Sequence, residues 1–212
     1  ITLDQIDLSE ASLNPNQELQ VQSEVNGTTH IETDQIRGFV EELSYPLYFL
    51  DFETINPAVP IYDGSKPYQQ LVFQYSLHIQ ETPTSGLKHR EYLADPNKDP
   101  RIEFIEQLIN DCGTIGDVLV YNISFERGKL NDLAEVFPIY SNTIKEIVNR
   151  LKDLMMPFQK KWYYTPEMKG RYSIKNVLNS FPKEYSYTTN IEKLKDRLVL
   201  ILHSPDASSN PG

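Results

Sequence analysis

Cysteine is nearly absent from this sequence, and so are long apolar runs. Cys112 is the single cysteine, which excludes an internal disulfide framework and is typical of a reducing compartment. No stretch approaches the roughly 18 consecutive apolar residues of a membrane-spanning helix. The four histidines and Cys112 show no zinc-ligand spacing. We therefore expect a cytoplasmic protein with no membrane partner.

Basic charge is also scarce, but it is unevenly distributed. The chain has 20 Lys and Arg against 30 Asp and Glu, a net charge of −10, which alone disfavours a nucleic-acid partner. Residues 145–197, however, hold twelve basic and six acidic side chains. Such asymmetry fits an acidic metal site beside a basic segment that binds phosphates, and a solvated basic face explains it equally well.

The sequence predicts one folded domain between two polar end segments. Residues 1–32 are rich in Asn, Gln, Ser and Thr, so we expect an extension or linker there. Residues 33–200 carry the periodic apolar patterns of a folded domain, whereas 201–212 read as a disordered tail. We expect the 212 residues to be part of a longer chain whose other domains are partners.

The order of predicted elements indicates an α/β fold. Pro46 begins one strand, and further strands are expected at 71–79, 87–93 and 117–122. Helices are expected at 34–43, after Asp99-Pro100, and at 125–136, 142–151 and 174–180. Short connections predict an antiparallel meander of the first three strands, followed by parallel strands. The result is a mixed sheet with helices on both faces.

Two carboxylates lie one residue apart in the first of these strands. Because strand side chains alternate, Asp51 and Glu53 share one face, and Leu50 and Phe52 share the other. Adjacent ionised acids repel each other and lose solvation, which a bound Mg²⁺ or Mn²⁺ offsets. The alternative is an edge strand whose acidic face meets water.

A third carboxylate is expected where a buried strand meets a helix. The strand ends near Asn122, and Glu126 falls in the first turn of the helix that follows. Backbone N–H groups and the helix dipole hold an acid at that place. The fold is expected to bring Glu126 to Asp51 and Glu53.

These two motifs resemble the DnaQ-like, or DEDD, 3′–5′ exonucleases, which have a ribonuclease H-like fold. Asp51-Phe52-Glu53 matches their Asp-x-Glu motif. Asn122-Ile123-Ser124-Phe125-Glu126 matches their Asn-x-x-Phe-Asp motif, with Glu126 in place of Asp. Residues 45–54, 67–68, 73–78 and 172–175 more closely resemble a bacterial family of unknown function that contains this domain.

The resemblance implies a metal-dependent nuclease acting on a single-stranded 3′ end of DNA or RNA. Asp51, Glu53 and Glu126 would be its catalytic residues and hold two Mg²⁺ or Mn²⁺ ions. The superfamily's third motif supplies a fourth acid. Residues 172–176 have its spacing but end in Asn, which leaves the fourth acid open among Asp153, Asp196 and Asp206.

Several further side chains are candidates for contact with the substrate: Asn122, Phe125, Tyr68, Gln74, Tyr172 and Lys175. Residues 160–164 interleave lysines with aromatic rings, as single-strand binders do, although a partly buried anchor has the same pattern. Two other functions remain open. One is a non-catalytic module that binds nucleic acid or protein with the same fold. The other is a carboxylate-based hydrolase such as a glycosidase.

Overall fold

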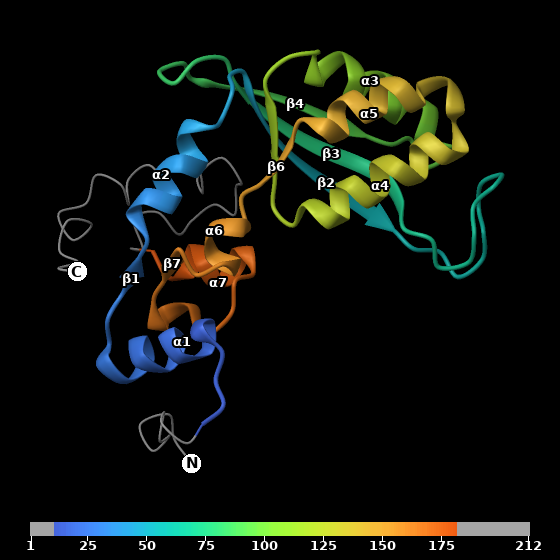
Figure 1. Cartoon of the computed structure of the whole chain (residues 1–212). Coiled ribbons are helices and arrows are strands. Elements are labelled where there is room, and N and C mark those ends of the chain that lie inside the picture. Colours follow the sequence, from blue (N-terminus) through green and yellow to red (C-terminus); the bar gives the residue numbers. More distant parts are fainter. Residues whose placement is uncertain (1–10, 182–212) are drawn as a thin grey trace. The chain divides into compact units, whose positions relative to one another are not determined.

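The computed structural model describes residues 11–181, which form two compact units (Figure 1). The first combines residues 11–42 with 154–181, and the second spans residues 43–153. The second unit contains a five-stranded sheet and all three carboxylates of the predicted site.

The sheet of the second unit is mixed. Its strands are β2 (Leu47–Ile55), β3 (Leu71–Gln80), β4 (Leu87–Leu93), β5 (Asp117–Val120) and β6 (Leu151–Asp153). Their spatial order is β4-β3-β2-β5-β6. The β2–β3 and β3–β4 pairs are antiparallel, whereas β5 pairs in parallel with β2 and with β6. The predicted meander followed by parallel strands is confirmed, and the strand that carries Asp51 is central.

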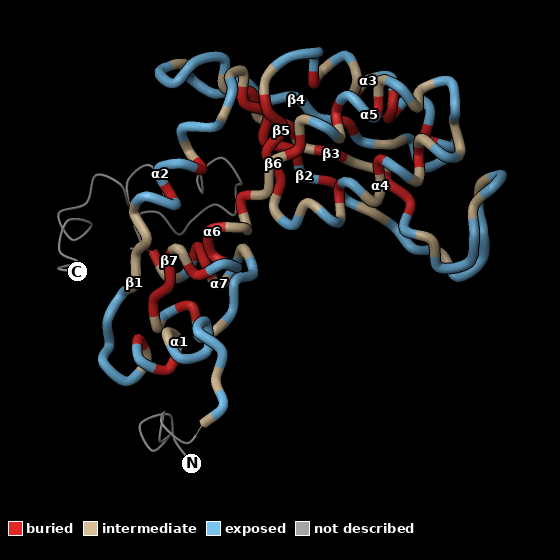
Figure 2. Tube along the Cα trace, in the orientation of Figure 1, coloured by how far each residue is buried: buried red, intermediate tan, exposed pale blue. Residues whose placement is uncertain are grey.

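Three helices of this unit cover one face of the sheet (Figure 1). They are α3 (Arg101–Cys112), α4 (Ile123–Val136) and α5 (Ser141–Asn149), and the short 3-10 helix η2 (Pro138–Tyr140) precedes α5. The buried core lies between these helices and the strands (Figure 2). Its members include Leu50, Phe52, Tyr75, Val118, Val120, Phe104, Leu108, Leu130 and Ile144. Helices on both faces stay a prediction, because the helices of the first unit have no determined position relative to this sheet.

Apolar spacing explains these elements. In β2, Leu50 and Phe52 are buried and Asp51 and Glu53 are exposed, which is the alternation of a half-buried strand. In α3, the apolar residues recur three and four positions apart and face the sheet. Strand β5 ends two residues earlier than predicted, because Asn122 adopts a left-handed conformation (φ 75°) directly before α4.

The first unit is built from short elements. It contains α1 (Pro15–Asn26), β1 (His30–Ile31), α2 (Thr33–Glu41), α6 (Met156–Gln159), β7 (Tyr163–Tyr164), η3 (Pro166–Met168) and α7 (Ile174–Asn179). Strands β1 and β7 pair antiparallel. Buried Lys161 lies 4.1 Å from the ring centre of Tyr164, and its Nζ donates to Gln20 of α1 at 3.3 Å. These contacts support the anchor interpretation of residues 160–164.

The two predicted end segments, residues 1–32 and 201–212, are only partly covered by the described residues. Helix α1 and strand β1 lie within residues 1–32, where we expect an extension or linker. The expected tail at 201–212, together with Asp196 and Asp206, lies outside the described residues. Across residues 11–181, no helix is both long enough and apolar enough to cross a membrane.

Candidate carboxylate site

Strand β2 presents its two carboxylates on the face opposite the helical core. Asp51 pairs with Ser76 of β3, and Glu53 pairs with Gln74. The register shifts directly after Glu53, so the strand is irregular next to this acid. Two like charges therefore lie on one face in the middle of the sheet.

The start of α4 supplies the third predicted carboxylate. Glu126 lies in the first turn of α4, and only 1% of its surface is exposed. The backbone N–H groups of Asn122 and Ile123 donate to the carboxylate of Asp153 at 3.0 and 3.1 Å. Because Asp153 ends β6, these two hydrogen bonds fix the helix start against the sheet and so orient Glu126.

The pKa of Glu126 reflects its burial and its charged surroundings. Burial, together with the charges of Asp51 and Asp153, raises the pKa of Glu126 to about 8. Glu126 Oε2 is buried with no hydrogen-bond partner within the described chain. A buried carboxyl with a free oxygen beside two other acids favours either a proton or a bound cation.

The pKa of Asp51 is also raised. The residue is exposed as a whole, but surrounding protein atoms partly desolvate its carboxylate and raise its pKa, and the charge of Glu53 raises it further. The backbone N–H of Phe52 acts in the opposite direction. Burial and the neighbouring charge of Glu53 therefore both disfavour the ionised form of Asp51.

The oxygen donors of this site suit a hard divalent cation, and the free oxygen of Glu126 is the observation that fits one. Among the described residues, no three His, Cys, Asp or Glu side chains are already arranged as a metal-binding group. Cation binding by Asp51, Glu53 and Glu126 would thus require their side chains to adjust.

The other predicted site residues have different surroundings. Asn122 caps the start of α4 through its backbone, and Phe125 is half-buried against the core. Tyr68 is 70% exposed with a left-handed backbone (φ 57°). Tyr172 and Lys175 lie in the first unit, whose position relative to the carboxylates is undetermined.

Asp153 is a candidate fourth acid in the sequence, with a structural acid at the end of a helix as the alternative. It ends the three-residue strand β6 and accepts two hydrogen bonds from the start of α4, which is a structural role, and its charge acts on Glu126. A strand of three residues is too short to show a periodic pattern, so the sequence did not predict this placement.

A second polar pair lies on the same face as Asp51. Ser76, directly opposite Asp51, forms a 3.0 Å hydrogen bond with Nε2 of His89 on β4. The ring of His78 stacks on that of His89, with 4.4 Å between the ring centres. Alternation within β3 and β4 is the signal that would have placed these residues on the face of Asp51.

The fold defines a class of protein: a mixed α/β domain with an exposed acidic pair on its central strand and a buried acid at the start of helix α4. More particularly, the chain belongs to the family described as domain of unknown function (DUF2779), whose model matches residues 48–173. The expected membership of a bacterial family of unknown function is therefore confirmed.

Relatives of the chain occur in Ureaplasma and Mycoplasma species. It is 34% identical over 157 residues to the uncharacterized protein UU173 of Ureaplasma parvum, covering 69% of the chain and 22% of that protein. It is 28% identical over 148 residues to the uncharacterized protein MG366 of Mycoplasma genitalium, covering 65% of the chain and 22% of that protein. It is 28% identical over 183 residues to the uncharacterized MG366 homolog of Mycoplasma pneumoniae, covering 76% of the chain and 26% of that protein. The chain thus spans about a fifth to a quarter of the length of these relatives.

Proposed function

We propose that this chain carries a ribonuclease H-like, metal-dependent nuclease of the 3′–5′ exonuclease type, acting on single-stranded ends of DNA or RNA. The observation that carries the proposal is Glu126, a buried acid with an unpartnered oxygen, whose pKa is raised by burial and also by the charge of Asp51. The strand order supports it, since an acidic pair lies on the central strand and a third acid lies at the strand–helix junction beside it.

The three acids have separate parts in this proposal. Asp51 would bridge two Mg²⁺ or Mn²⁺ ions, and Glu53 and Glu126 would support them. Such a pair of ions, when bound, activates the attacking water and stabilises the leaving oxygen. Asp153 is a positioning residue, because its hydrogen bonds to the start of α4 hold Glu126 in place.

Protonation of Glu126 is part of the same proposal. With its pKa raised to about 8, this carboxyl holds a proton at neutral pH when no cation is present. Ligation requires the ionised form, so binding of a cation would release that proton. Cation affinity is therefore expected to rise as pH increases toward 8.

The substrate would be held by residues around the acids. Asn122, Phe125, Tyr68 and Gln74 of the second unit are proposed contacts, and Tyr172 and Lys175 of the first unit complete the set. Gln74 is the best supported by geometry, since it lies directly opposite Glu53. A cytoplasmic location and a role for other domains of a longer chain belong to the same proposal.

The test is cleavage of a 3′-labelled single-stranded oligonucleotide in Mg²⁺ or Mn²⁺. Asp51→Asn should lower the rate by roughly 100-fold or more while the protein stays folded, because the change removes charge and nearly preserves volume. Glu146→Gln, which neutralises an exposed acid on α5, is the matched control and should cleave as the wild type does.

Two results would contradict the proposal. Equal cleavage by wild type and Asp51→Asn would show that the acids of β2 do not catalyse the reaction. Binding of the oligonucleotide without cleavage in either metal would favour the non-catalytic binding module.

A further inference from the structure

Strand β4 is an edge of the five-stranded sheet and exposes most of its length to solvent. It pairs with β3 on one side, and no strand of residues 11–181 pairs with its other side. Tyr92 is buried, and the other six residues of β4 are exposed. Leu87 and Leu93, at its two ends, are 45% and 68% exposed. An exposed edge strand of this kind can pair with another chain.

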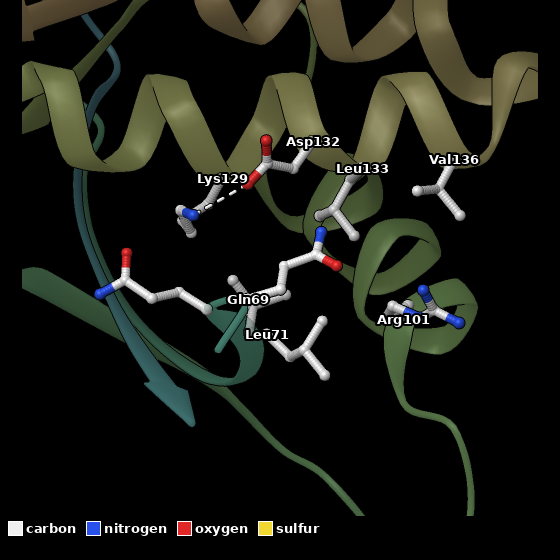
Figure 3. A pocket seen from close by; sticks show the side chains of 9 residues that line it. Gln69, Leu71, Arg101, Lys129, Asp132, Leu133 and Val136 are labelled. Carbon is white, nitrogen blue, oxygen red and sulfur yellow. Dashed lines mark hydrogen bonds and ion pairs between the residues drawn. The ribbon is translucent and has the colours of Figure 1, made fainter. Parts of the chain in front are cut away.

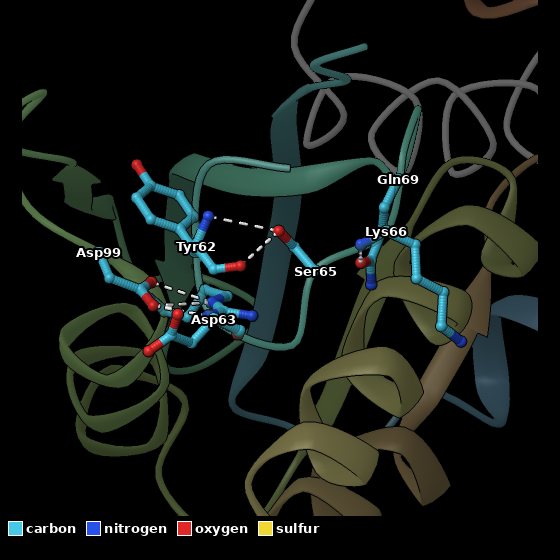
Figure 4. Close-up of polar contacts among 7 residues, drawn as sticks. Tyr62, Asp63, Ser65, Lys66, Gln69 and Asp99 are labelled. Carbon is cyan, nitrogen blue, oxygen red and sulfur yellow. Dashed lines mark hydrogen bonds and ion pairs between the residues drawn. The ribbon is translucent and has the colours of Figure 1, made fainter. Parts of the chain in front are cut away.

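Two other features of the second unit are occupied by contacts within the chain. Arg101 donates to Asp99 and, at 2.7 Å, to the carbonyl of Asp63, which holds the loop between β2 and β3 (Figure 4). Where the end of that loop meets α4, a pocket of about 10 Å³ has room for one water molecule (Figure 3). Lys129, which lines it, is paired with Asp132 at 2.8 Å. Neither place presents a row of open backbone groups as β4 does.

The direction of the backbone groups of β4 follows from its pairing with β3. The N–H of Ala94, directly after β4, donates to the carbonyl of Phe73 at 2.8 Å. Along an antiparallel strand, residues whose N–H and C=O bond the neighbour alternate with residues whose groups point away from it. The register of β4 with β3 is continuous, so the even-numbered residues bond β3. Four residues therefore direct their backbone groups to the free edge: Leu87, His89, Glu91 and Leu93.

The side chains of these four residues share the face of the sheet that carries Asp51. Glu91 pairs with Ser76, and Ser76 pairs with Asp51, so all three lie on that face. His89 uses Nε2 for its 3.0 Å hydrogen bond with Ser76. Its Nδ1 is thus available to a further partner. The free edge of β4 therefore presents two exposed leucines that flank a histidine and an acid.

Two contacts of β4 bear on whether another strand can join it. The side chain of Gln107 on α3 donates to the carbonyl of Glu91 at 3.0 Å, which fits a carbonyl that points away from β3. A carbonyl oxygen has two lone pairs and can accept a second hydrogen bond. Lysines on an edge strand oppose pairing, but Lys88 is neutralised by Glu81 of its own hairpin at 3.1 Å.

Alternation leaves few registers in which β4 can pair with a second copy of itself. Antiparallel pairing about a two-fold axis requires edge-facing residues to oppose edge-facing residues, so the axis passes through a residue. With Arg90 at the axis, Leu87 opposes Leu93 of the second copy, and His89 opposes Glu91. With His89 at the axis, His89 opposes itself and Leu87 opposes Glu91. With Glu91 at the axis, two acids meet. The register at Arg90 alone matches apolar with apolar and histidine with acid.

We infer that β4 pairs antiparallel with β4 of a second copy of this chain, about a two-fold axis at Arg90. His89 and Glu91 exchange backbone hydrogen bonds between the copies, and Nδ1 of His89 donates to the Glu91 carboxylate. The leucine pairs at the two ends lose their exposure to water. The two sheets become one continuous sheet with the acids of both copies on the same face. This inference does not depend on the proposed nuclease function.

The first test is disulfide cross-linking of the full 212-residue chain. At the axis, Arg90 and its copy form a non-hydrogen-bonded pair with Cα atoms about 4.5 Å apart, which a disulfide can bridge. Oxidised glutathione should therefore convert Arg90→Cys into a covalent dimer that a reductant reverses. Lys88→Cys is the matched control, because its two copies are four residues apart along the strands, about 14 Å. It should stay monomeric, as should the wild type, whose Cys112 is buried.

The second test is sedimentation equilibrium over a dilution series without cross-linking. The wild type should pass from the mass of one chain toward that of two as concentration rises. Glu91→Lys and His89→Glu should each raise the dissociation constant about tenfold, because each change affects two symmetry-related pairs. The double variant His89→Glu/Glu91→Lys restores an opposite-charge pair and should dimerise as the wild type does.

Three results would overturn the inference. One is a wild type that keeps the mass of one chain throughout the dilution series. Another is cross-linking of Lys88→Cys as readily as Arg90→Cys, or of neither, since the copies would then not meet at this axis. The third is a double variant that dissociates as readily as the two single variants, which would show that residues 89 and 91 do not face each other between copies.

Discussion

At the scale of single residues, Glu126 is the most unusual side chain in the described structure. It is an acid with 1% exposure, an unpartnered oxygen and a pKa raised to about 8. A proton on Glu126 relieves the repulsion from Asp51 and Asp153 in the folded state. In the unfolded chain the same carboxyl has its ordinary pKa of 4.5. This difference makes the stability of the protein depend on pH.

We predict that Glu126→Gln is more stable than the wild type at pH 8 in EDTA. Between pH 4.5 and about 8 the folded wild type binds more protons than the unfolded chain, so its free energy of unfolding falls as pH rises. Gln cannot ionise, so the free energy of unfolding of the variant does not fall for this reason. The advantage of the variant should grow from near zero below pH 4.5 to a plateau above pH 8, on the order of 5 kcal/mol for a pKa raised from 4.5 to about 8.

Urea unfolding across this pH range measures the effect, with Glu146→Gln as the control for loss of one exposed charge. A variant whose stability advantage is the same at pH 4 and pH 8 would show that the pKa of Glu126 is the same in the folded and the unfolded protein.

At the scale of elements, the turn between α3 and β5 fixes the position of β5 and, through β5, that of Glu126 at the start of α4. Arg150, at the end of α5, donates to four backbone carbonyls of this turn, those of Cys112, Gly113, Ile115 and Gly116. After this turn, β5 runs parallel to β2, and Leu47 of β2 pairs with Asp117 of β5. The start of α4, and with it Glu126, follows directly from the end of β5.

Gly116 is the position in this turn that tolerates no side chain. It has φ 81°, and a Cβ atom there would lie 2.0 Å from the carbonyl oxygen of Pro46. We predict that Gly116→Ala lowers the free energy of unfolding by about 3 kcal/mol, because both the backbone angle and the contact must change.

Gly128, within α4, provides a matched comparison of opposite sign. A Cβ atom at Gly128 meets nothing within 4 Å. Gly128→Ala should therefore stabilise the protein by about 0.5–1 kcal/mol through helix propensity. Urea midpoints of both variants test the pair, and a Gly116→Ala protein as stable as the wild type would contradict the packing described for this turn.

At the scale of the whole molecule, mutual repulsion of acids opposes folding. The chain carries a net charge of −10. Within the second unit, burial and the charge of Glu53 raise the pKa of Asp51, and burial and the charges of Asp51 and Asp153 raise the pKa of Glu126. A ligand that neutralises these groups only when the chain is folded would shift the folding equilibrium of the entire protein.

We predict that Mn²⁺ or Mg²⁺ raises the melting temperature of the wild type and has a much smaller effect on Asp51→Ala. The reason is mass action, since the ions bind the native site and not the unfolded chain. Thermal unfolding with and without the metal measures the shift, with Glu146→Ala as the comparison for loss of an exposed acid. Equal shifts in wild type and Asp51→Ala would place the metal elsewhere on the protein.

What the sequence by itself determined is the set of elements with long, regular patterns. The alternation of residues 50–53 predicted that Asp51 and Glu53 share one face of a strand and Leu50 and Phe52 the other, and the structure confirms it. The apolar stripes predicted α3, α4 and α5, and short connections predicted the meander. These patterns are local, because each reflects which side of one element meets the core.

Only the tertiary structure decided how distant short elements meet. The two hydrogen bonds that Asp153 accepts from the start of α4 join β6 to residues some thirty positions earlier, and no local pattern records such a contact. The raised pKa of Glu126 likewise depends on burial and on charges from two other strands. The pKa of Glu126 is therefore set by packing, since the proton affinity of an acid changes when the fold removes water from it and brings other charges near.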